Sequence, residues 1–283
     1  MPTTIPTTTS STRPGSPSTG DAYFETDTNN YIIYDGANWR AYVSDGTSVP
    51  GVSNTYSLSL DGTDDSASVT GSSEIQLDSN LTVSTWIYPT AFNSTIRGII
   101  SWGQNSVGKG RGLMLDVARP AWVGYGAGAN ITSTTTLSTN TWYHLAATYD
   151  GTTVKIYLNG SLDTTGTPSL SSFTYTATYI GELFWSQTTA ARHFEGYIDE
   201  VSLFNSALDS ANIQAIYNGG SPINLNSNVN NYQSASNLVA WWRMGDGTEA
   251  GSGTTIYDMS TNDSNSDDLT IINQGSFVSS VPS

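Results

Sequence analysis

The chain has 283 residues, of which 24 are acidic and 9 are basic, so its formal net charge is −15, and it contains no cysteine. This charge argues against nucleic acid and anionic membranes as partners, because both would repel the surface, and the absence of cysteine excludes disulfides and thiolate metal sites. Only 12% of residues are charged and helix-favouring stretches are scarce, which excludes a helical bundle and predicts an all-β protein with one main domain.

Residues 1–19 form the first segment, in which 15 positions are Ser, Thr or Pro. Such a composition cannot bury a core, so it predicts an extended N-terminal arm. The N-terminus lacks the basic start and the apolar run of a secretory signal, and no stretch of the sequence approaches ~18 continuous apolar residues. We therefore expect neither membrane insertion nor export through such a signal.

Residues 20–50 contain three short strand-like stretches separated by turns rich in Asp, Asn and Gly, which predicts a small β meander. The runs 20–29 and 34–39 are similar to short repeats in phage tail-fibre and virion proteins, and this resemblance implies an anchoring or oligomerising role. A lone meander of this size is marginally stable, so its aromatic side chains need cover from neighbouring subunits or from the adjoining domain. These side chains are Tyr23, Phe24, Tyr31, Tyr34 and Trp39.

Residues 51–283 carry the patterns of a larger β domain. Val154, Ile156 and Leu158 alternate with Lys155 and Tyr157, which is the period of a strand with one buried face. The pairs at 150–151 (Asp-Gly) and 159–160 (Asn-Gly) bracket this strand. Because such pairs readily adopt positive φ angles, they predict two successive antiparallel hairpins.

One short helix is predicted within residues 208–219. Ile213, Ile216 and Tyr217 repeat at helical spacing, Asp209 or Ser210 can cap the start, and Gly219 can close the end. Further strands are expected at 56–60, 81–89 and 99–103.

Two motifs in this domain resemble a known family. Residues 142–151 (WYHLAATYDG) and 196–201 (GYIDEV) are similar to the laminin-G-like jelly roll of the concanavalin A-like lectin/glucanase superfamily. The resemblance implies an all-β, concanavalin A-like jelly-roll sandwich that binds at a surface and is not an enzyme. The segment 238–258 resembles one that opens the domain in many relatives, so residues 221–283 are expected to complete the sandwich, with a separate partner contact as the alternative.

Five acidic residues are candidate metal ligands: Asp61, Asp64, Asp65, Asp199 and Glu200. Ca²⁺ takes about 6 to 8 oxygen ligands, and the family resemblance implies that such an ion can lie at the rim of the sandwich. The alternative is that these carboxylates cap turns and accept hydrogen bonds from backbone amides.

The sequence argues against glycoside hydrolysis, which needs two carboxylates ~5–10 Å apart around the scissile bond. Glucanases of the superfamily place them at alternate positions of one strand. Residues 195–200 lack that alternation, and the adjacent Asp199 and Glu200 of a regular strand would point to opposite faces. Of the two histidines, His144 is expected to be structural and His193 to be a solvated loop residue.

The resemblance implies sugar recognition by aromatic rings and polar side chains in the rim loops. Core or interface packing is the alternative for each candidate. The loop-adjacent candidates are Trp102, Trp122, Tyr125, Phe184, Trp185 and Arg192, and the residues assigned to the core are Trp86, Trp142, Trp241 and Trp242.

Together these features predict a phage virion structural protein, a head decoration, head fibre or tail-fibre component, that displays a lectin-like domain to the host. A virion protein made in the host cytoplasm and released by lysis needs no export signal. The expected partners are other virion proteins through residues 1–50, host-surface glycans, and further copies of the chain in a closed oligomer such as a trimer. The alternatives are a secreted or surface-bound bacterial carbohydrate-binding adhesin and a degenerate glycoside hydrolase.

Overall fold

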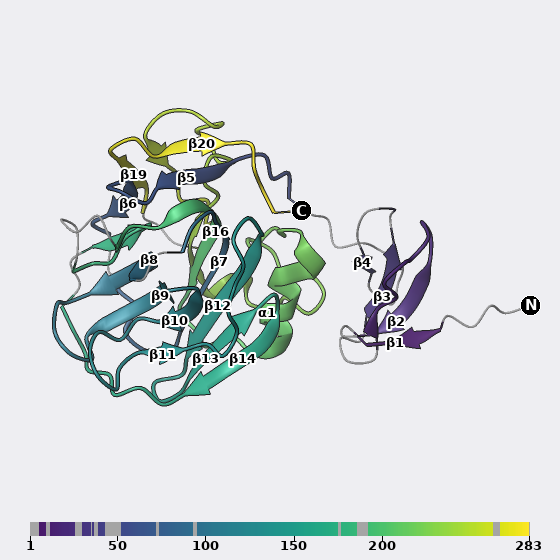
Figure 1. The fold of residues 1–283 in the computed structure, drawn as a ribbon, viewed down its shortest axis with the longest axis horizontal. Helices are drawn as coiled ribbons and strands as arrows, with labels where there is room; N and C mark the ends of the chain where they lie inside the picture. Colours follow the sequence, from purple (N-terminus) through teal and green to yellow (C-terminus); the bar gives the residue numbers. More distant parts are fainter. Residues whose placement is uncertain are drawn as a thin grey trace, which may run out of the picture.

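Alternating apolar side chains build two large antiparallel sheets that pack face to face, with a small third sheet beside them (Figure 1). This computed structural model describes residues 6–9, 12–25, 30–34, 36, 39–42, 52–71, 74–92, 95–174, 177–185, 192–262 and 267–282. The two large sheets form a sandwich, and the prediction of an all-β jelly-roll architecture is confirmed.

Sheet I has the strand order β14-β13-β12-β7-β16-β5-β20, and β17 also pairs with β16. Its strands are β14 (Ser161–Gly166), β13 (Val154–Leu158), β12 (Tyr143–Tyr149), β7 (Leu81–Pro89), β16 (Glu195–Phe204), β5 (Ser57–Asp61), β20 (Ser276–Val278) and β17 (Leu238–Trp242). The two predicted hairpins are present as β12-β13-β14, and the second closes through positive φ at Asn159 (48°) and Gly160 (76°).

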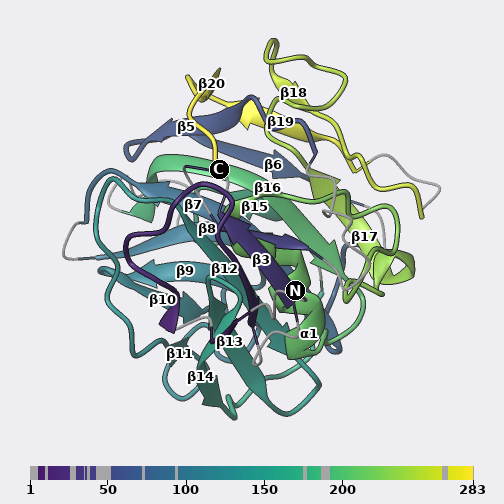
Figure 2. The same cartoon turned by 90° about the vertical axis from the view of Figure 1, so that its right-hand side faces the viewer.

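Sheet II has the order β11-β10-β9-β8-β15-β6-β19-β18. Its strands are β11 (Ile131–Thr132), β10 (Arg119–Trp122), β9 (Gly110–Asp116), β8 (Ile96–Gly103), β15 (Thr178–Ile180), β6 (Ser66–Val69), β19 (Leu269–Ile272) and β18 (Thr255–Ile256). The C-terminal segment thus contributes strands to both sheets, and β5, β19 and β20 lie together at one edge of the molecule (Figure 2).

The main core lies between the sheets. Val83 and Ile87 of β7 face inward from sheet I, and Ile100 of β8 and Leu113 of β9 face them from sheet II, all without exposed surface. Burial of this apolar area, at roughly 25 cal/mol per Å², is the main stabilising term of a chain that has no disulfide.

A second core covers the outer face of sheet I. Helix α1 (Ser210–Tyr217) begins at Asp209, whose carboxylate accepts a hydrogen bond from the Asn212 N–H, and it ends at the left-handed Asn218. The short 3-10 helices Asn218–Gly220 (η3) and Ala235–Asn237 (η4) follow. The predicted helix is confirmed. Tyr157, expected on a polar face, is 1% exposed because this layer covers it, so that part of the alternation prediction is wrong.

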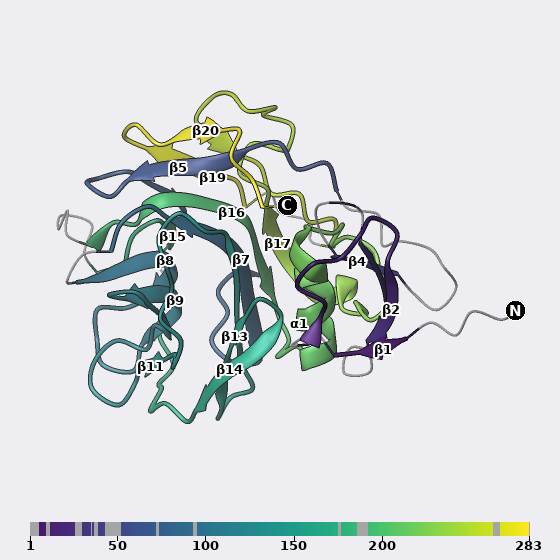
Figure 3. The ribbon, with the colours of Figure 1, turned by 45° about the vertical axis from the view of Figure 1, so that its right-hand side comes forward.

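The small sheet contains β1 (Thr7–Thr8), β2 (Ala22–Glu25), β3 (Asn30–Tyr34) and β4 (Trp39–Tyr42). Tyr23 and Tyr34 pack on Trp39 with ring centroids 5.6 and 5.5 Å apart. This sheet lies beside α1, with β4 against η3 (Figure 3). Residues 1–5, 10–11, 26–29, 35, 37–38 and 43–51 of the predicted arm and meander, and the Tyr31 side chain, lie outside the described residues.

Among the described residues, no helix combines the length and the hydropathy needed to cross a bilayer.

Candidate functional site

Three aromatic side chains from two separate loops meet on the outer side of sheet II. The ring centroids of Phe184 and Trp185 are 4.6 Å apart, and those of Tyr125 and Trp185 are 4.7 Å apart, both edge to face. Tyr125 and Trp185 are half-buried, whereas Phe184 is buried beneath them. We call these three residues the aromatic cluster. It leaves two aromatic side chains partly open to solvent on a packed support.

The loop that carries Phe184 and Trp185 is pressed directly onto β8. The Phe184 N–H donates to Ser101 Oγ (2.9 Å), and the Ser101 hydroxyl donates to the Glu182 carbonyl (3.0 Å). A Cβ on Gly98 would lie 2.1 Å from the carbonyl carbon of Glu182, so only glycine permits this approach. The loop is therefore held by the strand and does not depend on a ligand for its position.

The turn that carries Tyr125 is fixed in a strained conformation. Tyr125 has φ of +61°, which costs a non-glycine residue on the order of 1–3 kcal/mol. Asn130 Oδ1 compensates by accepting hydrogen bonds from the Gly124 N–H (2.8 Å) and the Tyr125 N–H (2.9 Å). Strain of this kind, maintained by neighbouring groups, is typical of functional sites. Val107, which is 62% exposed, lies beside the same turn against Gly126.

Trp102 and Trp122 are corrections to the predicted sugar-binding set. Both are 0% exposed and belong to the main core. Trp102 Nε1 donates to the Leu77 carbonyl (2.8 Å), and the Trp122 ring packs on Tyr149 at 5.9 Å. Their side chains point between the sheets, where no surface ligand can reach them.

Arg192 is half-buried and forms no ion pair with a described residue. Its neighbour His193 is 3% exposed, with Nε2 3.3 Å from Glu182 Oε2, so the expectation of a solvated His193 is wrong. Lys109 is half-buried. Its loop lies next to Tyr125, because the Gly108 N–H donates to the Tyr125 carbonyl. Lys109 Nζ donates to Gln104 Oε1 (3.3 Å).

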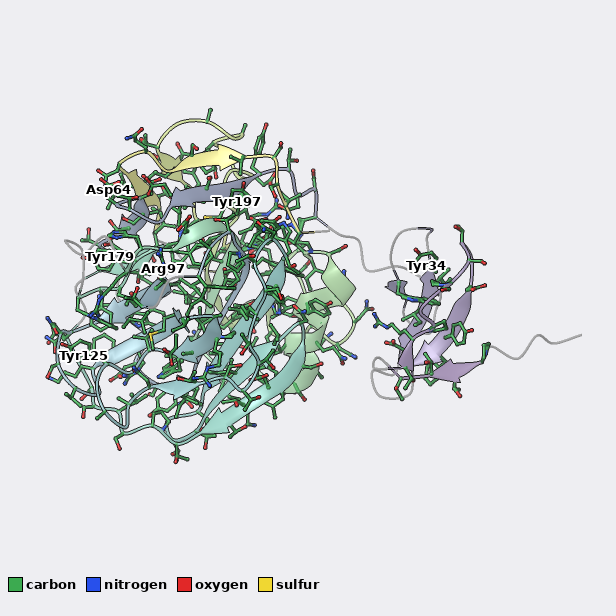
Figure 4. All side chains as sticks on the ribbon, in the orientation of Figure 1. Tyr34, Asp64, Arg97, Tyr125, Tyr179 and Tyr197 are labelled. Atoms are coloured by element: carbon green, nitrogen blue, oxygen red, sulfur yellow. The ribbon has the colours of Figure 1, made fainter. Side chains whose placement is uncertain are left out.

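Asp61, Asp64 and Asp65 converge on the turn between β5 and β6. One carboxylate oxygen of each lies within 4.8 Å of the others, and Figure 4 shows Asp64 and Tyr125 on the side of the sandwich away from the small sheet. Asp61 Oδ1 accepts from the Thr63 N–H (2.7 Å), which lowers the pKa of Asp61, and Asp65 Oδ1 accepts from the Gln274 N–H (2.8 Å). The turn-capping role is therefore real, and the remaining oxygens are of the type that Ca²⁺ prefers.

Asp199 and Glu200 do not join this acidic turn and are a second correction. The pairing of β16 shifts between Asp199 and Ser202, and Glu200 has φ of +48°, so a β-bulge breaks the strand alternation here. Glu200 accepts from Trp241 Nε1 (2.6 Å) and from Arg243 Nη2 (2.9 Å), while Asp199 accepts from Asn54 Nδ2 (2.9 Å).

The bulge also overturns the expectation that these two carboxyl groups point to opposite faces. Asn54, which donates to Asp199, directly follows Ser53, whose carbonyl accepts from the Arg243 guanidinium that binds Glu200. The same short segment therefore lies beside both carboxyl groups. Burial, and then the charge of Glu200, raise the pKa of Asp199 well above its ordinary value. Both are buried, at 0% and 5% exposure. In this arrangement they brace the fold and do not face a polymer substrate.

Sequence reasoning missed a second group of aromatic side chains. Trp142, assigned to the core, is half-buried on the outer face of sheet I beside Tyr88 (5.5 Å) and Tyr197 (6.4 Å). Leu145 and Ala147 of the adjoining strand face the main core, so strand alternation places Trp142 outward, and this signal could have found it. Trp86, Trp241 and Trp242 are buried as expected, and His144 is buried against Ser84.

The chain is similar to several solved structures. A candidate carbohydrate-binding protein from Bacteroides ovatus aligns over 94% of this chain and 71% of its own, with 20% identity and a TM-score of 0.59. A heptameric SAP-like pentraxin from Limulus polyphemus aligns over 58% of this chain and 82% of its own (15% identity, TM-score 0.45). The CBM40 of the Ruminococcus gnavus IT-sialidase, bound to α2,3-sialyllactose, aligns over 59% of this chain and 100% of its own (15% identity, TM-score 0.46).

No curated protein sequence matches the chain significantly. The sequence profile described as the concanavalin A-like lectin/glucanases superfamily matches residues 61–214, which is more than half of the chain. These residues include the whole hairpin region, β16 and the first turn of α1. The chain therefore belongs to the concanavalin A-like lectin/glucanases superfamily.

Proposed function

We propose that this protein binds glycans without cleaving them and that it does so through the aromatic cluster. The observation that carries the proposal is the pre-formed pair of partly exposed rings, Tyr125 and Trp185, supported by Phe184. Aromatic side chains with a fixed position lose little conformational entropy when they bind, so they are effective contact surfaces. Lys109, whose loop adjoins Tyr125, adds a hydrogen-bond donor, and we include Arg192 in the proposed site as a second donor.

The biological setting that we propose is the surface of a phage particle. The Ser/Thr/Pro-rich arm and the small sheet would anchor the protein to other virion proteins, in a closed oligomer such as a trimer, and the sandwich would display the aromatic cluster to host-surface glycans. The resemblance of residues 20–39 to virion repeats supports this setting. A secreted or surface-bound bacterial adhesin is the second candidate, and the fold suits it equally well.

Particle incorporation separates the two settings. If residues 1–50 anchor the protein, deletion of these residues should abolish its incorporation into phage particles while the sandwich remains able to bind glycan. Unchanged incorporation of the truncated protein would contradict the anchoring role.

Trp185→Ala tests the glycan-binding site. We expect the full chain to bind at least one glycan on an array that includes neutral and anionic structures, and the substitution to weaken that binding about tenfold or more, as for other central aromatic contacts. The control is Tyr257→Ala, which removes another exposed ring (38%) beside β18, at the opposite end of sheet II. Equal binding by the Trp185→Ala variant and the wild type would exclude the aromatic cluster as the site.

We further propose that the acidic turn binds Ca²⁺. Added Ca²⁺ at about 100 times its Kd should stabilise the fold by about 2.7 kcal/mol, and a chelator should reverse the resulting rise in Tm. Asp61→Asn should remove this response. Asp150→Asn is a matched control, because Asp150 Oδ1 accepts from the Thr152 and Thr153 N–H groups in a similar turn that belongs to no cluster of three acidic side chains among the described residues. A Tm that is insensitive to both Ca²⁺ and chelator would contradict the proposal.

A further inference from the structure

Three aromatic side chains from one row of neighbouring strand positions meet on the outer face of sheet I. Tyr88 of β7 pairs in register with Tyr197 of β16, with ring centroids 5.3 Å apart and planes 21° apart. The Trp142 ring lies 5.5 Å from Tyr88 and 6.4 Å from Tyr197, so the three rings form a compact triangle. Near-parallel rings at 5.3 Å are offset, because directly stacked rings would lie at about 3.5–4.0 Å. All three side chains are half-buried, so parts of their faces are open to solvent. We call them the aromatic row.

The aromatic row lies at the limit of the helical layer. The neighbouring row contains Trp86 and His144, and Tyr217 of α1 stacks on Trp86 at 5.7 Å. The aromatic row is the next one along the strands, beyond this cover. Figure 4 shows Tyr197 on β16, away from the small sheet that carries Tyr34.

Polar side chains extend the row on the same face. Tyr197 pairs with Ser59 of β5, and Ser59 pairs with Ser276 of β20, which adds two hydroxyl groups beside the rings. One step further along the strands, Glu195 pairs with Asp61. A basic side chain close to this border, Arg97, is 1% exposed, donates to the His193 carbonyl and lies 3.9 Å from Glu195. The open surface is therefore aromatic and hydroxylic with an acidic border.

We propose that the aromatic row is a second glycan-binding surface, on the opposite sheet from the aromatic cluster, and that its ligand is an uncharged oligosaccharide. This inference rests on the proposed function. Ring faces can pack on the C–H groups of a sugar while the serine hydroxyls exchange hydrogen bonds with its hydroxyl groups. The carboxylates of Glu195 and Asp61 disfavour an acidic sugar, because no exposed cation in the row would compensate its charge.

A second copy of the chain is a less suitable occupant. The centre of a protein interface is depleted of charged residues, and a stable interface buries on the order of 1,000 Å² or more. The aromatic row is a compact group of three half-buried rings with carboxylates at its border, and the exposed aliphatic side chains of the described residues, Val107, Val117 and Leu162, lie elsewhere. A sugar, which needs far less buried area than a second subunit, fits this surface better.

The test uses the full chain and soluble polysaccharides of known charge. Electrophoretic migration of the protein is compared in two kinds of gel, one containing neutral galactomannan, xyloglucan or laminarin and the other containing anionic polygalacturonate. The proteins compared are the wild type and the Trp142→Ala, Trp185→Ala and Tyr257→Ala variants. We expect at least one neutral polysaccharide to retard the wild type and Trp142→Ala to weaken that retention about tenfold, while Tyr257→Ala leaves it unchanged. Hydroxyl-radical footprinting of the wild type, which needs no substitution, should show that the same polysaccharide protects Tyr88, Trp142 and Tyr197.

The outcomes separate this inference from the proposed function. If only Trp185→Ala weakens retardation of the protein by the neutral polysaccharide, and Tyr88, Trp142 and Tyr197 stay unprotected, the second surface is excluded. The aromatic cluster then remains as the binding site. If polygalacturonate binds the aromatic row as well as the neutral chains do, the charge argument is wrong. If Trp142→Ala changes the oligomeric mass and not the retention, the row is a subunit interface. If the wild type binds no glycan on an array or in any gel, both proposals fail.

Discussion

Arg243→Met is expected to lower the free energy of unfolding by about 3–5 kcal/mol at neutral pH, the usual cost of removing one partner of a buried ion pair. Arg243 is 7% exposed, and its Nε and Nη2 donate to Glu200 Oε1 at 3.0 and 2.9 Å. Nη2 also donates to the Ser53 carbonyl (2.6 Å), and the guanidinium lies 5.1 Å from the centroid of the Trp241 ring. The substitution therefore leaves the buried Glu200 without its cation and frees the chain before β5.

The loss of unfolding free energy in the Arg243→Met variant should increase as the pH rises. Burial raises the pKa of Glu200 above 4.5, although Arg243 opposes the shift, so loss of Arg243 raises it further. A carboxyl group with a raised pKa in the folded state stabilises the fold below its unfolded pKa, and this contribution is lost as the pH rises. The difference between variant and wild type should thus be smaller near pH 4 and grow towards pH 7 in chemical denaturation.

Two variants control for charge and for volume. Arg119→Met removes an exposed pair with Asp116 (3.8 Å, 47% side-chain exposure for Arg119) and should cost less than about 1 kcal/mol. The double variant Glu200→Gln with Arg243→Met removes both charges and should recover most of the loss. A loss below 1 kcal/mol for Arg243→Met alone would show that this pair does not hold β16 and β17 together.

Local patterns were sufficient for the hairpins and the helix. The Asn-Gly pair at 159–160 adopts the positive φ angles that its chemistry favours, and Asp209 caps α1 as its side chain allows. These features depend on residues within one turn of each other, so a single sequence contains the information needed to predict them.

The bulge at Asp199–Glu200 could not be predicted locally. It lies where β16 changes partners, from β5 at Glu195–Ile198 to β17 at Val201–Phe204. These partner strands lie on opposite sides of β16 in the sequence, one more than a hundred residues upstream and the other several tens of residues downstream. Only the assembled sheet brings them to the same edge, and the interruption between them produces the bulge.

The sequence indicated the three residues of the aromatic cluster as candidates, but it did not indicate the contacts that bring them together. Tyr125, Phe184 and Trp185 were named from loop composition, but their convergence depends on Gly98 and Ser101 of β8 and on Asn130, none of which has a distinctive local pattern. For Trp102 and Trp122, proximity to loops was the wrong criterion. Alternation with Ile100, which faces the core, indicates an inward Trp102, just as Leu145 indicates an outward Trp142.

Trp102→Ala and Trp122→Ala should each lower the free energy of unfolding by about 3–5 kcal/mol, because each leaves a large cavity in the main core. Both side chains are 0% exposed. A surface sugar-binding tryptophan would instead lose affinity with little loss of stability, so the two roles predict opposite measurements. Chemical denaturation of both variants, with Trp185→Ala as the half-buried surface counterpart, distinguishes them.

Substitution by phenylalanine should separate the two core tryptophans from each other. Trp102→Phe removes the hydrogen bond to the Leu77 carbonyl (2.8 Å) and leaves a buried acceptor unpaired, which costs about 1–3 kcal/mol beyond the loss of volume. Trp122 Nε1 is buried and donates to no atom of the described residues, so Trp122→Phe removes a donor that was already unsatisfied. We therefore expect Trp122→Phe to be the milder change by about 1 kcal/mol or more. Equal losses would mean that Trp122 Nε1 has a hydrogen-bond partner in solution, such as a buried water molecule, because loss of that partner would make the two substitutions equivalent.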